Sequence, residues 1–122
     1  LKMDSFVGLD IPVNEGLLVS EADICTALSI SPQTLREEVE ENRMFSVAYQ
    51  NRELYPLFFS DKQFPRDELA EVCKALERLP SVGKWLFLTN PSYSLGGISP
   101  LEALKQRKFK QVLVLAYAFA DL

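Results

Sequence analysis

The sequence predicts an α+β protein that is mainly helical, in which a helix-turn-helix-like pair with a β-hairpin is followed by a C-terminal helical bundle. Three observations predict this class: two capped helical patterns separated by a short break, two β-rich runs around a polar turn, and helical periodicity over the second half of the chain. With 122 residues, of which 48% are hydrophobic and 25% charged, the chain suits one globular domain or two small subdomains that share a core.

We divide the chain into an N-terminal arm at residues 1–18, a helix-turn-helix-like subdomain with a β-hairpin at 19–61, and a helical partner-binding subdomain at 62–122. The arm contains three residues that disfavour a helix: Gly8, Pro12 and Gly16. We therefore expect irregular backbone there, with one short strand near residues 17–19. Met3 is a candidate natural start, and the two residues before it would then not be native.

The helix-turn-helix-like pair is predicted from two N-terminal capping signals. Ser20 is followed three residues later by an acid, a pattern that satisfies free amides in the first turn of a helix. After a break at residues 29–31, Ser31 caps a second helix, and Pro32 takes its first position, where the missing N–H costs nothing. We expect this second helix to run to about residue 42.

A β-hairpin is expected next. Two β-rich runs, residues 45–49 and 54–58, flank the polar residues 50–53, which predicts a hairpin with a four-residue turn. Pro56 cannot donate a hydrogen bond to a β-ladder, so we place it at the edge or end of a strand. The order of these elements, which is helix, short turn, helix and hairpin, is typical of a winged or excisionase-like helix-turn-helix.

The second half of the chain carries four helical patterns. We expect helices at residues 65–79, 82–88, 99–107 and 108–120. Pro80 ends the first helix, and a turn-rich loop at residues 89–97 separates the second from the third. Ser99 and Pro100 repeat the capping signal, with serine before the helix and proline at its first position.

Several classes of enzyme chemistry have no visible site in this sequence. The chain contains no histidine, which excludes Ser-His-Asp and Cys-His nucleophiles and histidine-based metal sites. Cys25 and Cys73 stand at apolar positions of helical patterns, so we expect buried free thiols in a reducing compartment. Neighbouring glutamates point apart on a helix, and no glycine-rich phosphate loop is present. We therefore predict no enzyme activity, no catalytic residue, no metal and no cofactor.

Charge divides unequally between the two halves of the chain. Residues 1–61 carry four basic and eleven acidic side chains, a net charge of −7, whereas residues 62–122 carry nine basic and six acidic side chains, a net charge of +3. Four of the six residues from Lys105 to Lys110 are basic. Such an asymmetry attracts a partner of opposite sign or pairs one half of the protein with the other.

A helix-turn-helix places its second helix in the major groove of DNA and leans its hairpin on the phosphate backbone. Residue types that bond base edges or phosphates occur at suitable positions here. The candidate DNA-binding residues are Gln33, Thr34 and Arg36 for base edges, and Arg43 and Arg52 for phosphates. The second helix also carries four glutamates, so residues 32–44 have a net charge of −2, which opposes phosphate binding.

The most specific stretch of the sequence lies between residues 85 and 104. It consists of Trp85-Leu86, then Asn90-Pro91, then the run Leu95-Gly96-Gly97-Ile98-Ser99-Pro100-Leu101-Glu102-Ala103-Leu104. This stretch resembles the C-terminal toxin-binding domain of Xre/MbcA/ParS-type antitoxins, and the resemblance covers about residues 66–120. The N-terminal half differs from that family's multi-helix repressor-like module.

The resemblance implies a small helical bundle that binds and masks a cognate toxin, often of the RES type that acts on NAD. It also implies an N-terminal DNA-binding module that represses the operon. The residues that the resemblance places in or beneath the partner-binding region are Trp85, Asn90, Pro91, Leu95, Gly97, Ser99, Pro100 and Leu104.

We therefore expect a non-enzymatic, antitoxin-like regulatory protein that binds a protein partner, with a toxin as the candidate partner and operator DNA as a second one. Two alternatives stay open: a protein-interaction or oligomerisation module without DNA binding, and a DNA-binding transcription regulator without a toxin. The last helix is apolar on more than one face, which predicts a homodimer. The apolar residues concerned are Val112, Leu113, Leu115, Ala116 and Phe119.

The most apolar stretch, residues 112–120, is nine residues long, whereas a helix that crosses a bilayer needs about 20 residues. We therefore expect a buried helix, no membrane contact and a cytoplasmic location.

Overall fold

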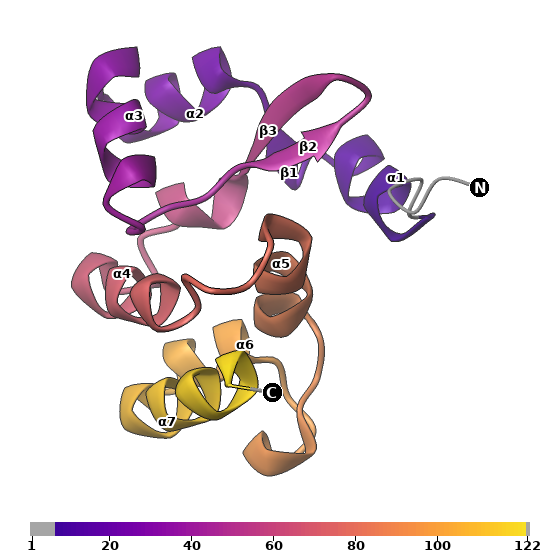
Figure 1. The fold of residues 1–122 in the computed structure, drawn as a ribbon, viewed down its shortest axis with the longest axis vertical. Helices are drawn as coiled ribbons and strands as arrows, with labels where there is room; N and C mark the ends of the chain where they lie inside the picture. Colours follow the sequence, from indigo (N-terminus) through magenta and orange to yellow (C-terminus); the bar gives the residue numbers. More distant parts are fainter. Residues whose placement is uncertain (1–6, 122) are drawn as a thin grey trace.

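The computed structural model describes residues 7–121, so the candidate start at Met3 lies outside the described residues. The protein is mainly helical with one small sheet, as the sequence predicts (Figure 1). Its elements are α1 (Val7–Asn14), β1 (Leu18–Val19), α2 (Glu21–Leu28), α3 (Pro32–Glu40), β2 (Val47–Tyr49), β3 (Arg52–Pro56), the 3₁₀ turn η1 (Leu57–Ser60), α4 (Arg66–Ala75), α5 (Ser81–Thr89), the 3₁₀ turn η2 (Tyr93–Leu95), α6 (Pro100–Lys105) and α7 (Phe109–Ala120).

The N-terminal segment is not the irregular arm that we predict. Residues 7–14 form α1, although this helix contains Pro12. Leu9 is buried in the core, and the Tyr49 hydroxyl donates a hydrogen bond to the Asp10 carboxylate. These contacts with the rest of the protein outweigh the poor helix propensity of the segment. Gly16, with φ of 76°, turns the chain into β1, which confirms the short strand expected near residues 17–19.

The capping signals of the helix pair are confirmed. The Ser20 hydroxyl accepts a hydrogen bond from the Asp23 amide at 3.1 Å, and the Ser31 hydroxyl accepts one from the Thr34 amide at 3.1 Å. Between the two helices, Ser29 adopts a left-handed conformation with φ of 58°. Figure 1 shows α2 and α3 together at one end of the molecule.

The predicted hairpin is present, but its turn is shorter than expected. Tyr49 pairs with Arg52, so Gln50 and Asn51 alone form the turn, with φ of 51° and 64°. Two-residue hairpin turns need this left-handed backbone because it matches the twist of the strands. Arg52 is therefore the first residue of β3, whereas the sequence pattern predicts that it lies in the turn.

The sheet has three antiparallel strands in the order β1-β3-β2. Pro56 is the last residue of β3, as predicted, and lies opposite Leu18. Its missing N–H leaves the ladder incomplete at this end, and the next amide, that of Leu57, donates to the Leu17 carbonyl at 2.8 Å. Residues 57 and 58 belong to η1 and not to the strand that we expect over 54–58.

The four helices of the second half agree with the sequence except at the end of α4. This helix stops at Ala75, four residues earlier than predicted, and the following residues form tight turns such as the bond from the Glu77 amide to the Lys74 carbonyl. Pro80 disfavours helical backbone only at Leu79, so it does not account for the end at Ala75. Among the described helices, none has the length and apolarity needed to cross a bilayer.

One hydrophobic core runs through both halves of the chain and across the predicted boundary at residue 61. Phe58 of η1 stacks on Trp85 of α5, with ring centroids 5.9 Å apart and an interplanar angle of 13°. Cys25 and Cys73 are buried and unpaired, as predicted. The helix pair and the C-terminal bundle are therefore joined by shared packing and not only by a linker.

Candidate protein-binding groove

The candidate base-reading residues lie at the N-terminal end of α3. Gln33 and Arg36 are exposed there, whereas Thr34 is half-buried and its hydroxyl accepts a hydrogen bond from the Ser31 hydroxyl at 3.1 Å. Arg52 is exposed at the start of β3. The fold thus exposes three of the five predicted DNA-binding side chains, while Thr34 takes part in the helix cap.

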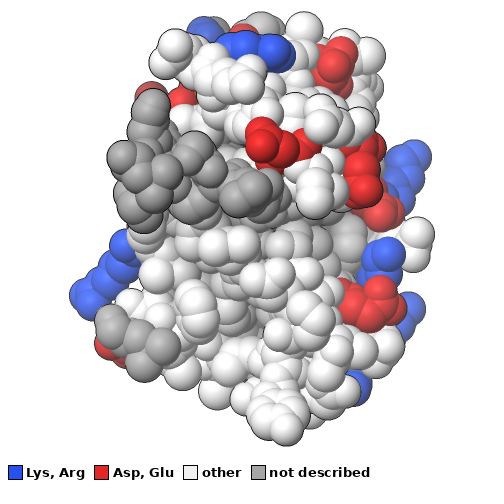
Figure 2. Space-filling model, turned by 90° about the vertical axis from the view of Figure 1, so that its right-hand side faces the viewer, with Lys and Arg blue, Asp and Glu red and all other residues white. Residues whose placement is uncertain are grey.

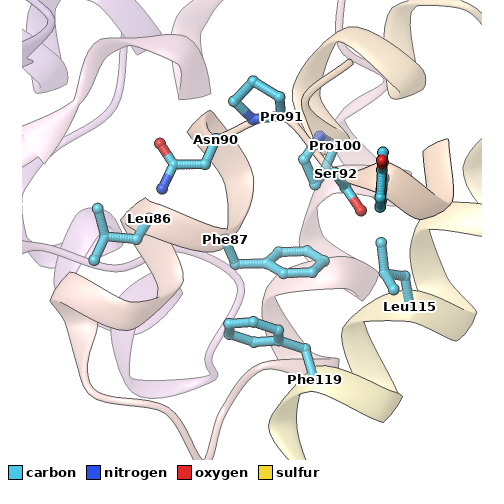
Figure 3. A pocket seen from close by; sticks show the side chains of 9 residues that line it. Leu86, Phe87, Asn90, Pro91, Ser92, Pro100, Leu115 and Phe119 are labelled. Carbon is cyan, nitrogen blue, oxygen red and sulfur yellow. The ribbon is translucent and has the colours of Figure 1, made fainter. Parts of the chain in front are cut away.

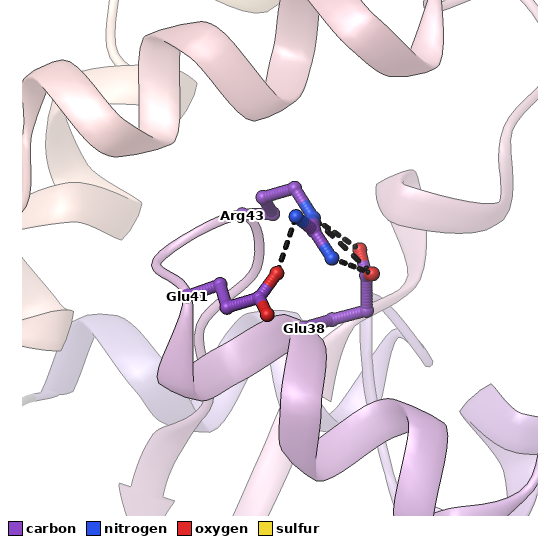
Figure 4. Close-up of polar contacts among 3 residues, drawn as sticks. All are labelled: Glu38, Glu41 and Arg43. Atoms are coloured by element: carbon purple, nitrogen blue, oxygen red, sulfur yellow. Dashed lines mark hydrogen bonds and ion pairs between the residues drawn. The ribbon is translucent and has the colours of Figure 1, made fainter.

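Arg43 is bound by two carboxylates of its own chain (Figure 4). Its guanidinium donates three hydrogen bonds to Glu38, the shortest at 2.5 Å, and forms an ion pair with Glu41. The hydrogen bonds that Arg43 donates to Glu38 hold the pKa of the Glu38 carboxyl below its usual value and raise the pKa of Arg43. In this arrangement Arg43 closes the C-terminal end of α3 and is not an open cation facing a phosphate.

Half of the predicted partner-binding residues are buried. Trp85, Leu95, Pro100 and Leu104 all belong to the interior. Of these four, Pro100 also borders the groove described below, whereas the other three do not. The Ser99 hydroxyl caps α6 by accepting a hydrogen bond from the Glu102 amide at 3.1 Å. That leaves Asn90, Pro91 and Gly97 exposed.

The loop between α5 and α6 is held by its own backbone. The Ser92 amide donates to the Ile98 carbonyl at 2.9 Å, and the Gly97 amide donates to the Ser92 carbonyl at 2.9 Å. Gly96 and Gly97 have φ of 77° and 88°, a conformation that glycine adopts without steric cost. The two glycines therefore close a tight loop that places η2 beside α7.

A groove of about 480 Å³ opens between α5, this loop, α6 and α7 (Figure 3). We call it the α5–α7 groove. It is lined by Leu86, Phe87, Asn90, Pro91, Ser92, Tyr93, Pro100, Leu115 and Phe119. Phe87 and Phe119 form one wall, with ring centroids 5.0 Å apart. Three of the predicted partner-binding residues, Asn90, Pro91 and Pro100, are thus brought together here.

Apolar side chains of this groove reach the surface. Leu86 is 44% exposed, and Tyr93 is fully exposed. None of the described residues that line the groove is an acid, a lysine or an arginine. Figure 2 shows the face that carries α5 and the following loop: its lower half is mostly uncharged, with charged side chains toward the margins. The groove is therefore an uncharged, partly exposed apolar surface.

Sequence reasoning missed part of this groove. It assigns no binding role to Leu86, Phe87, Ser92 or Tyr93, and it places Leu115 and Phe119 in a dimer interface. A signal was available in α5, where four consecutive large apolar residues, 85–88, exceed what one buried helix face can hold.

Comparison of the chain with protein-family models, with curated proteins and with solved structures finds no match. The resemblance of residues 85–104 to the antitoxin domain stays a prediction that rests on the motif.

Proposed function

We propose that this chain is a non-enzymatic, antitoxin-like regulatory protein that binds another protein in the α5–α7 groove. The observation that carries the proposal is the exposed apolar lining of that groove, in the segment whose motif resembles a toxin-binding domain. Protein interfaces are centred on aromatic and aliphatic side chains that enter a hollow and exclude water. Leu86, Tyr93 and Phe119 are side chains of this kind.

The composition of the groove defines the kind of partner segment. Phe87, Leu115 and Phe119 offer an apolar floor and wall for one or two large apolar side chains of the partner. Asn90 and Ser92 add an amide and a hydroxyl, which can bond the main chain of the same segment. We infer a partner that inserts an apolar turn or helix end, with no requirement for charge at the centre.

The same composition favours recognition over catalysis. Tyr93 is the one ionisable side chain among the described residues that line the groove, and no carboxylate or amine stands beside it to exchange a proton. A groove with few titratable groups stabilises a bound surface through burial of apolar area.

DNA binding by the helix pair has weaker support. Gln33 and Arg36 are exposed on α3, yet the glutamates on the same helix repel phosphates, and Arg43 is occupied by Glu38 and Glu41. Neutralisation of phosphates supplies much of the affinity of DNA-binding proteins. We therefore assign the partner-binding role to the groove and no phosphate contact to Arg43.

Co-expression with the product of the adjacent gene tests the proposal. We expect the wild-type chain to retain that protein, and Leu86→Asp to raise the dissociation constant about 100-fold, because it places a charge at an apolar interface. The substitution leaves the core intact, since Leu86 is partly exposed. Failure of the wild-type chain to bind the neighbouring product would contradict the antitoxin-like role.

Leu17→Asp is the matched control. Leu17 is 45% exposed, almost the same as Leu86, but lies outside the α5–α7 groove. Circular dichroism spectra of both variants verify that they are folded. If Leu17→Asp weakens binding as much as Leu86→Asp, or if neither does, the partner does not bind in the groove.

A further inference from the structure

Helix α7 carries an exposed stripe that differs from the groove wall. Lys110, Val114 and Tyr117 lie on α7, and Asp121 is the residue that caps its C-terminal end. Their spacing of four, three and four residues places them within about 60° of one another around the helix axis. We call these four residues the α7 stripe. Val114 is 70% exposed and Tyr117 is 55% exposed, and the two charged residues are exposed as well.

Two other faces of α7 are already used. Val112 and Ala116 are buried in the core, and Leu115 and Phe119 line the α5–α7 groove. The helix lies at the opposite end of the molecule from α2 and α3 (Figure 1). A second protein on the α7 stripe would therefore leave the groove open and would stay clear of the helix pair.

The charge pattern of the stripe is complementary to itself. A base stands at its N-terminal end and an acid at its C-terminal end, with two apolar residues between them. When two such helices lie antiparallel about a two-fold axis, each Lys110 faces an Asp121 of the other copy, and each Val114 faces a Tyr117. A parallel arrangement would instead place like charges opposite each other, which is unfavourable.

We propose that a second copy of this chain docks antiparallel on the α7 stripe and forms a two-fold symmetric dimer. The centre of the interface would be four apolar side chains, two from each copy, closed at both ends by a Lys110–Asp121 ion pair. Antiparallel packing also sets the helix dipoles of the two copies in opposite directions, which is favourable. The dimer does not depend on the protein partner in the groove.

Asp121 has a neighbour within its own chain. Arg78 Nη1 lies 3.8 Å from Asp121 Oδ1, and both side chains are more than 70% exposed. A long, solvent-exposed pair of this kind contributes little stability. Asp121 can therefore turn to Lys110 of a second copy at small cost.

Analytical ultracentrifugation of charge-reversed variants tests this register. We expect the wild-type chain to dimerise at concentrations of about 100 μM. Lys110→Glu and Asp121→Lys should each raise the dissociation constant about tenfold, because each turns two attractive pairs into repulsive ones. The double variant should return to within about threefold of the wild type, and a mixture of the two single variants should form the heterodimer.

The recovery of binding in the double variant can only come from contacts between the two copies. Residues 110 and 121 are roughly 16 Å apart along one helix axis, beyond the Debye length of about 8 Å in physiological salt. Lys62→Glu is the control for net charge, because Lys62 is an exposed lysine outside α7. In a parallel dimer, residue 110 of one copy would face residue 110 of the other, so Lys110→Glu would replace one like-charged pair by another. Unchanged association of this variant would therefore overturn the antiparallel register.

A second pair of variants tests the apolar centre. Val114→Glu should raise the dissociation constant about 100-fold, whereas Ile11→Glu, a similar change at a 62% exposed site on α1, should have no effect. Leu86→Asp should leave the dimer mass unchanged, which separates this interface from the groove. A wild-type chain that stays monomeric up to about 0.5 mM, or a double charge variant as weak as the single ones, would overturn the proposal.

Discussion

Replacement of Phe58 by alanine tests whether the two halves of the chain share one core. Phe58 lies in η1, within the predicted helix-turn-helix-like subdomain at residues 19–61. Its ring centroid lies within 6.4 Å of the ring centroids of four other aromatic residues, Phe45, Phe59, Phe64 and Trp85. Truncation of a fully buried phenylalanine costs about 3–5 kcal/mol. Because Phe58 is half-buried, we expect the free energy of unfolding to fall by about 2–3 kcal/mol.

Urea unfolding gives the measurement, with two probes. Far-UV circular dichroism reports all the helices, and fluorescence reports Trp85, the one tryptophan of the chain. With a slope of about 1–3 kcal/mol per molar urea, the loss corresponds to a midpoint lower by about 0.7–3 M. If the core is shared, both probes should shift by the same amount, because the protein unfolds in one cooperative step.

Phe119→Ala serves as the control. Phe119 is partly exposed and packs at a tilt against Phe87 in the groove wall, so its removal should cost less than about 1 kcal/mol. The reasoning is refuted if Phe58→Ala lowers the midpoint seen by circular dichroism while the Trp85 fluorescence transition keeps its wild-type midpoint. That result would mean that the two halves unfold as separate units.

Three further measurements examine local features. Hydrogen bonds from Arg43 lower the pKa of Glu38 in the folded protein. The ionised carboxylate therefore stabilises the fold fully above the unfolded-state pKa, near 4.3, and this contribution is lost as the pH falls through the lower folded-state pKa. In thermal melts, the destabilisation caused by Glu38→Gln should therefore shrink between pH 7 and pH 3. In the two-residue hairpin turn, the double change Gln50→Asn and Asn51→Gly should raise the free energy of unfolding by about 0.5 kcal/mol in urea titrations, because asparagine and glycine adopt positive φ more easily. A loss of stability would contradict a turn with positive φ at both positions. Burial raises the pKa of the Cys73 thiol to about 12. A thiol reagent at pH 8 should therefore modify Cys73 only as fast as the protein unfolds. Rapid modification in the folded state would show that the thiol is accessible.

Helix starts were the features most easily predicted from sequence. Ser20, Ser31 and Ser99 each accept a hydrogen bond from an amide three residues later, so the interaction that begins the helix is contained in four consecutive residues. The strand preference of the hairpin is similarly local. Its turn length was wrong because the pairing of Tyr49 with Arg52 depends on both strands together, and the polar character of residues 50–53 does not encode that register.

Helix α1 shows the opposite case. Its glycine and proline disfavour a helix, and the helix forms because Leu9 is buried and Asp10 binds Tyr49, 39 positions away in the sequence. The candidate DNA-binding set was altered in the same manner. Arg43 is a plausible phosphate ligand by residue type, and only the fold brings its guanidinium against Glu38 and Glu41.

The motif at residues 85–104 overlaps the α5–α7 groove, but it did not separate buried residues from exposed ones. Trp85 and Leu104 lie in the core, while Leu86 and Tyr93 reach the surface. The sequence by itself determined the helical class, the caps and the excess of apolar residues on α5 and α7. Which of those residues pack inward, and which line a groove or form a stripe, was decided by the way the helices pack together, because burial depends on neighbours that are distant in the sequence.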